Sequence, residues 1–115
     1  MVGGTAFAEG GARVSNPVGI GYAPSNLITT VPVTTQVDRL LAQRPVLDST
    51  DLVFLWAGAN DGFTQLGMIG GGAATPTEGL TQMALEGGVM AAQVQRLRTA
   101  GAKYVVVALV PNLAN

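Results

Sequence analysis

The chain contains no histidine and no cysteine, and both absences restrict its chemistry. Without histidine it cannot by itself assemble a Ser-His-Asp triad or a histidine-bearing metal site. Without cysteine it has no disulfide, thiolate nucleophile or cysteine metal site. We therefore expect no metal ion and no cofactor. The remaining acid–base candidates are the carboxylates of Glu9, Asp38, Asp48, Asp51, Asp61, Glu78 and Glu86.

Charge is also scarce. Charged residues make up 11% of the 115 residues, against roughly 25% in an average soluble protein. Hydrophobic residues reach 48%, and there are 16 glycines. This composition is typical of an internal segment of a larger domain. The net charge of −1 and the scattered arginines give no support for nucleic-acid binding. The longest apolar runs, 52–59 and 104–111, are too short to span a bilayer.

Local patterns predict an α/β organisation. The first thirty residues are rich in Gly, Pro, Ser and Asn and are expected to form loops. A helix is expected over 35–43, with Thr34 or Thr35 as its N-cap and Pro45 after its end. Apolar runs predict buried parallel strands over 52–56 and 104–110. A glycine-rich loop is expected over 62–74.

A long helix is expected between the two strands. Thr75-Pro76-Thr77-Glu78 has the pattern of a capping box with proline at the first helical position, and Gly101 suits the position after the C-cap. The predicted apolar face consists of Leu80, Met83, Ala84, Met90, Ala91, Val94 and Leu97. The result is one β-α-β unit, which needs further strands and helices to be stable.

Two segments are candidates for a site. Gly58-Ala59-Asn60-Asp61 directly follows the first strand, where open parallel sheets bind ligands. The Asn60 amide is a neutral donor that can serve a developing oxyanion, although Asn60-Asp61 also fits a simple polar turn. The other segment, residues 3–14, reads GGTAFAEGGARV, and its paired glycines can aim backbone N–H groups at a ligand.

Together these segments resemble conserved blocks II and III of the SGNH/GDSL serine hydrolases, the bacterial esterases and lipases. Those enzymes read Gly-Gly-Thr-Asn-Tyr-Ala-x-Gly-Gly-Ala-Arg and then Trp-x-Gly-Ala-Asn-Asp. The stretch 56–61 matches the later block. Residues 36–41 resemble the intervening helix, 93–107 the next helix and strand, and 111–113 the segment after that strand. The resemblance covers nearly the whole chain. It implies part of a three-layer α/β/α, flavodoxin-like fold with a parallel sheet, of which residues 1–115 are a central segment.

The resemblance also implies a mechanism. In this family a serine attacks an ester carbonyl, a histidine acts as base, and the oxyanion is held by backbone and asparagine N–H groups. It assigns Asn60 and Gly10 to the oxyanion hole, with Gly11 as the alternative to Gly10, and it makes Asp61 structural. The serine block and the Asp-x-x-His block are both missing, so the remainder of the hydrolase domain is required and the chain is expected to be inactive alone.

Some residues differ from the family pattern, and others are expected to have structural roles. Ala6 and Phe7 replace the usual asparagine and tyrosine of block II, which we interpret as a subfamily difference. Trp56 is expected either to be core or to pack beneath the crevice, and the Met83–Met90 stripe is expected to be core. Serines at positions 15, 25 and 49 lie beside Asn, Pro or Asp and are expected in turns or caps rather than as nucleophiles.

Two alternatives stay open. One is a stand-alone α/β binding module or pseudoenzyme. The other is a Rossmann-like nucleotide-binding segment, although Gly70-Gly71-Gly72 lacks the G-x-G-x-x-G spacing after a strand. The resemblance implies an ester or lipid substrate, whose acyl chain the sequence does not specify. It also implies export to the periplasm, outer membrane or exterior, while the sequence itself leaves the localisation unknown.

Overall fold

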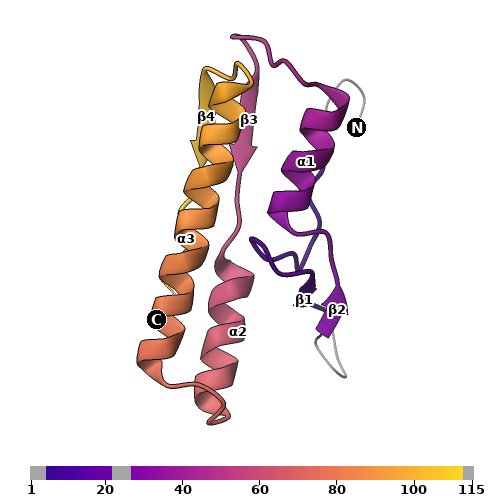
Figure 1. Ribbon diagram of the computed structural model, residues 1–115. Coiled ribbons are helices and arrows are strands. Elements are labelled where there is room, and N and C mark those ends of the chain that lie inside the picture. Colours follow the sequence, from indigo (N-terminus) through magenta and orange to yellow (C-terminus); the bar gives the residue numbers. More distant parts are fainter. Residues whose placement is uncertain (1–4, 22–26, 113–115) are drawn as a thin grey trace.

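The computed structural model describes residues 5–21 and 27–112, which form a mixed α/β structure (Figure 1). The described elements are β1 (Val18–Ile20), β2 (Leu27–Thr29), α1 (Val33–Gln43), β3 (Leu52–Leu55), α2 (Ala59–Gly70), α3 (Pro76–Thr99) and β4 (Tyr104–Val107). They make an antiparallel pair, β1–β2, and a parallel pair, β3–β4. The fold class is therefore α/β with a parallel sheet of two described strands.

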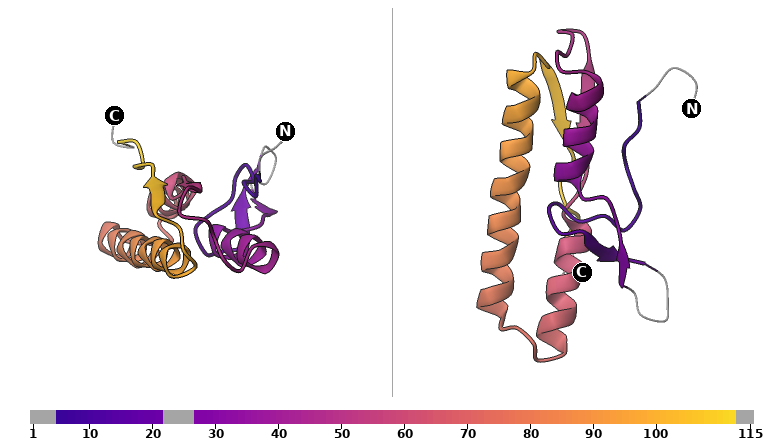
Figure 2. Two further views of the ribbon diagram at one scale, coloured as in Figure 1. Left: turned by 90° about the horizontal axis from the view of Figure 1, so that it is seen from above. Right: turned by 45° about the vertical axis from the view of Figure 1, so that its right-hand side comes forward.

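The parallel pair confirms the central sequence prediction. Leu52 pairs with Tyr104 and Leu55 with Val107. Because α2 and α3 both lie between these strands, the crossover contains two helices rather than one. Helix α3 covers one face of the sheet, and α1 lies beside α3, as Figure 2 shows from above. The core forms where these elements meet, from Val33, Val37, Leu47, Leu55, Leu97 and Ala102.

Both ends of α3 follow the sequence prediction. The Thr75 hydroxyl accepts a hydrogen bond from the Glu78 N–H, and the Glu78 carboxylate accepts one from the Thr75 N–H. This hydrogen bonding by Thr75 lowers the pKa of Glu78. At the other end Gly101 has a φ of 119°. The Gly101 and Ala102 N–H groups donate to the carbonyls of Arg98 and Leu97, which is the Schellman pattern.

The expected loop over 62–74 is wrong, because most of it belongs to α2. Glycines at 62, 67 and 70 each disfavour a helix by about 1 kcal/mol relative to alanine, but α2 packs along α3. The absence of a side chain at Gly79 permits close contact, since an added Cβ would lie 2.8 Å from the Ile69 Cδ1. Tertiary packing therefore outweighs the weak local propensity.

Two predictions for the N-terminal third are also corrected. The supposed loop contains the β1–β2 ribbon, in which Val18 pairs with Thr29 and Gly19 with Ile28. Helix α1 starts at Val33 with Pro32 as its N-cap, rather than at Thr35. The Val33 and Thr34 N–H groups donate to the carbonyls of Arg13 and Val14, at 3.1 Å each. A distant segment thus supplies the cap that a threonine side chain was expected to supply.

The sheet is far more exposed than two buried strands should be. Leu52, Phe54 and Trp56 are 68%, 60% and 68% exposed, and Tyr104 and Val106 lie on the same bare face. The predicted core position of Trp56 is therefore wrong for the described chain, because no described element covers this face. The strand expected to reach Val110 also ends at Val107.

The buried line of α3 is narrower and more polar than predicted. It consists of Gly79, Glu86, Gln93 and Leu97. Leu80 is 73% exposed, Ala84 and Ala91 are exposed, and Met83, Met90 and Val94 are half-buried. The prediction followed hydrophobicity alone. The face of α3 that packs against α2 and the N-terminal segment instead carries hydrogen-bonding side chains.

Candidate functional site

The site lies at the carboxyl end of β3, where the strand turns into α2. Gly58 has a φ of 106° and is the N-cap of α2, so the chain changes direction within one residue. Asn60 and Asp61 consequently occupy the first turn of the helix, and the interpretation of this pair as a simple polar turn is wrong. The N–H groups of a helix N-terminus favour a negative ligand.

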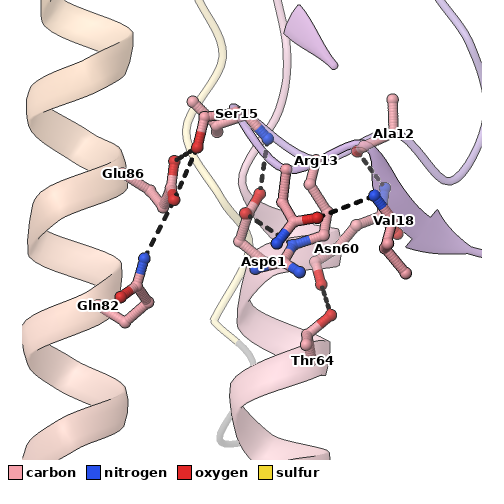
Figure 3. Close-up of polar contacts among 11 residues, drawn as sticks. Ala12, Arg13, Ser15, Val18, Asn60, Asp61, Thr64, Gln82 and Glu86 are labelled. Carbon is pink, nitrogen blue, oxygen red and sulfur yellow. Dashed lines mark hydrogen bonds and ion pairs between the residues drawn. The ribbon is translucent and has the colours of Figure 1, made fainter. Parts of the chain in front are cut away.

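Asn60 points toward the N-terminal glycine segment rather than into open solvent. Its Nδ2 donates a hydrogen bond of 2.9 Å to the Ala12 carbonyl (Figure 3). A side-chain amide has two N–H donors, so one remains beyond this contact. The Thr64 hydroxyl donates to the Asn60 backbone carbonyl at 2.8 Å, one turn further along the helix. Asn60 is thereby held in place at its backbone and its side chain.

Asp61, the next residue of the helix, is buried, at 1% exposure. Its Oδ1 lies 3.1 Å from the Arg13 Nε, and its Oδ2 accepts a 3.0 Å hydrogen bond from the Val14 N–H. Both partners belong to the N-terminal segment, 47 and 48 residues away. Asp61 therefore anchors that segment to α2, in agreement with a structural role.

Ser15 and Glu86 form a second anchor, which the sequence did not reveal. The Ser15 hydroxyl lies 2.9 and 2.8 Å from the two carboxylate oxygens of Glu86, and the Gln82 side chain donates to one of them at 3.1 Å. Figure 3 shows Asp61 on α2 and Glu86 on α3 reaching the same segment from two helices. Ser15 is thus a tertiary contact. Ser49 lies in an exposed turn as expected, and Ser25 lies outside the described residues.

Gly10 and Gly11 form the turn opposite Asn60. Gly11 has a φ of 80°, and its carbonyl accepts a 2.9 Å hydrogen bond from the Ile20 N–H. A Cβ on Gly11 would collide with the Ile20 carbonyl, whereas a Cβ on Gly10 would meet nothing within 4 Å. Within residues 5–21 and 27–112 neither glycine N–H donates a hydrogen bond. Two backbone donors are therefore available at this turn.

The three sequence-predicted site residues share one hollow. Gly10, Gly11 and Asn60 line a cavity of about 300 Å³ together with Trp56. Trp56, Val33, Gln36 and Ala8 also line a larger slot of about 640 Å³ between α1 and β3. The structure thus brings together residues fifty positions apart in the sequence, in a hollow that shares part of its lining with the slot.

The hollow carries hydrogen-bond donors on Gly10, Gly11 and Asn60, and its lining also includes the carboxylate of Glu9, which is an acceptor. In the part of the chain that the structure describes, no three Asp or Glu residues cluster as a metal site would require. None of its helices is long and apolar enough to cross a membrane. Gly70 and Gly71, which lack the spacing of a nucleotide-binding loop, lie at the end of α2, roughly 18 Å of helix away from β3.

Comparison of the chain with models of protein families, with curated proteins and with solved structures finds no match. Any assignment of function therefore depends on the site itself.

The two glycines of the turn should respond differently to substitution. Gly11→Ala is expected to destabilise the fold by about 1–3 kcal/mol or more, because it adds a steric collision to a left-handed backbone position. Gly10→Ala is the matched control and is expected to cost under about 1 kcal/mol. Urea unfolding followed by circular dichroism compares the two variants. Equal stability of both would contradict the geometry of this turn.

Proposed function

We propose that this chain forms the oxyanion-binding part of a carboxylic-ester hydrolase of the SGNH/GDSL type, an esterase or lipase. The observation that carries the proposal is the convergence of Asn60 with Gly10 and Gly11 on one hollow at the carboxyl end of β3. Gly10 is the preferred backbone donor and Gly11 the alternative. The complete domain would have the three-layer α/β/α fold, with the described sheet as part of its central layer.

Electrostatic catalysis explains why such a hollow suits ester hydrolysis. When a nucleophile adds to an ester carbonyl, the oxygen gains negative charge, and N–H donors already in place stabilise it without reorganisation. Asn60 cannot lose a proton to the oxyanion, and glycine N–H groups are not screened by a side chain. The ion pair of Arg13 with Asp61 holds the glycine segment against α2, which keeps the donors at a constant separation.

The nucleophile and the base come from outside these 115 residues in this proposal. The sequence has no histidine, and Ser15 is engaged by the buried carboxylate of Glu86. The partners are therefore an ester or lipid substrate and the remainder of the hydrolase domain. Nucleic acid has no place in the proposal, because the site contains no basic patch.

The donor hollow can be tested in the chain as it is. Methylphosphonate is a small tetrahedral oxyanion that mimics the charge of the intermediate. We expect its titration, at millimolar concentrations, to shift the NMR signals of the Asn60 side-chain amide and of the Gly10 or Gly11 N–H. The Asn60→Ala variant should lose the shifts of the glycine signals, while Thr64→Ala, one turn further along α2, should keep them. Shifts confined to the Arg13 and Lys103 side chains would contradict the proposal.

The same chain should be catalytically silent. Purified protein is expected to hydrolyse a p-nitrophenyl ester no faster than a histidine-free background protein, because a general base contributes about 10²–10⁴ in rate and is missing. Turnover above that background, abolished by a change at Ser15, would place the nucleophile within the chain and overturn the division of roles proposed here.

A further inference from the structure

Glu9 is the only acidic or basic residue among the described residues that line the hollow of about 300 Å³. The Ala12 N–H donates a 3.3 Å hydrogen bond to the Glu9 carbonyl, which closes a turn and fixes Glu9 directly before the glycine donors. Glu9 is exposed, and within residues 5–21 and 27–112 its carboxylate makes no hydrogen bond or ion pair. It stands at position x of the block II pattern, so the resemblance assigns it no role. The carboxylate is therefore available to a ligand.

Trp56 adds an aromatic surface to the same hollow. It follows β3 directly, and 68% of its surface is exposed. The arginine nearest to Glu9 in the sequence, Arg13, does not line the hollow and is paired with Asp61 at 3.1 Å. The lining that the structure describes thus combines a carboxylate and an aromatic side chain without a cation to neutralise them.

A carboxylate and an aromatic ring in one hollow suit a quaternary ammonium group. Such a cation is attracted by the face of the indole ring as well as by the carboxylate. It has no N–H donors to satisfy, whereas a primary ammonium has three and is strongly hydrated. A negatively charged substrate group would be repelled by Glu9. The hollow therefore favours a cationic ligand, although its glycine and Asn60 donors favour a partly negative oxygen.

We propose that Glu9 and Trp56 bind a quaternary ammonium group of the ester substrate, as in an ester of choline. The donors on Gly10 and Asn60 take the carbonyl oxygen, and Glu9, which adjoins Gly10 in the chain, takes the cation of the same small molecule. The placement of the ester carbonyl rests on the proposed function. The cation site consists of different side chains and can be tested separately.

Trp56 reports binding directly, because it is the only tryptophan of the chain. The probes are choline and neohexanol, which has the same shape with carbon in place of the charged nitrogen. We expect choline to quench the Trp56 emission at millimolar concentrations. It should bind at least about tenfold more tightly than neohexanol, because ring and carboxylate both attract the cation. Equal affinity of the two molecules would overturn the proposal.

Substitution of Glu9 tests the charge of the site. Glu9→Gln keeps the size of the side chain and removes its charge, so choline should bind about fivefold more weakly. The same variant should bind methylphosphonate more tightly, since repulsion of the anion is relieved. Asp38→Asn is the matched control, because it changes the net charge equally while Asp38 lines neither cavity. Choline binding that is the same in both variants would overturn the role of Glu9.

Two comparisons separate this inference from the proposed function. Methylphosphonate shifts of the Gly10 signal without any effect of choline on Trp56 would overturn the cation site alone. Choline binding without a glycine response to methylphosphonate would contradict the ester chemistry alone. Acetylcholine should also bind more tightly than phosphocholine, whose phosphate is repelled by Glu9. The reverse order would assign the cation to a lipid headgroup and overturn the choline ester as substrate.

Discussion

Replacing Asp61 with alanine is expected to lower the free energy of unfolding by about 3–5 kcal/mol, because it leaves the Arg13 guanidinium buried without its counter-charge. The Arg13 and Asp61 side chains are 9% and 1% exposed. The Val14 N–H would lose its acceptor at the same time. Such a loss approaches the whole stability of a small domain. Urea or thermal unfolding measures it directly.

Asp38→Ala is the matched control for this experiment. Asp38 pairs with Arg96 at 2.6 Å, but the two side chains are 60% and 38% exposed. Water screens that pair, so its loss should cost under about 1 kcal/mol. A variant at Asp61 that is no less stable than the one at Asp38 would contradict the buried anchor. Double replacement of Arg13 and Asp61 by apolar residues should recover part of the loss, since no charge then stays unpaired.

The second large effect concerns catalysis by the complete hydrolase, once the nucleophile and base are supplied. There, Asn60→Ala is expected to lower kcat by about 10²–10³ with little change in KM, because an oxyanion donor acts mainly in the transition state. Steady-state hydrolysis of an ester substrate by wild type and variant provides the comparison. An unchanged kcat would remove Asn60 from the oxyanion hole.

The contact of Asn60 with the Ala12 carbonyl calls for a structural control in the same experiment. If this amide only holds the glycine segment, the variant should lose stability along with activity. If it serves the oxyanion, kcat should fall while the free energy of unfolding changes by no more than about 1 kcal/mol. Thr64→Ala, which removes a bond to the Asn60 backbone, should leave kcat within a few-fold of wild type.

The exposed sheet face has a consequence for the behaviour of the chain. Its radius of gyration is 15.3 Å, whereas a compact domain of this length has about 13 Å. Leu52, Phe54 and Tyr104 are more than half exposed on one side of the parallel pair, yet parallel sheets are normally covered on both faces. Surface of this kind favours association with other polypeptide.

The sequence by itself determined the features whose signals are local. The capping box at Thr75, the Schellman glycine at Gly101 and the apolar runs of β3 and β4 each depend on neighbouring residues, and each was predicted in place. The exclusion of a triad from the chain follows from composition, with no need of structure. Gly10, Gly11 and Asn60 were identified as candidates from their motifs, although a motif cannot show that they meet.

Only the tertiary structure decided the rest, because the deciding contacts join distant residues. Helix α2 forms despite its glycines since it packs on α3 through Gly79. Helix α1 begins early because the Arg13 and Val14 carbonyls cap it. Hydrophobicity predicted a core position for Trp56, which no described element covers, and it gave no signal that Glu86 would be buried against Ser15. Burial depends on what lies opposite a residue in space, which local sequence does not contain.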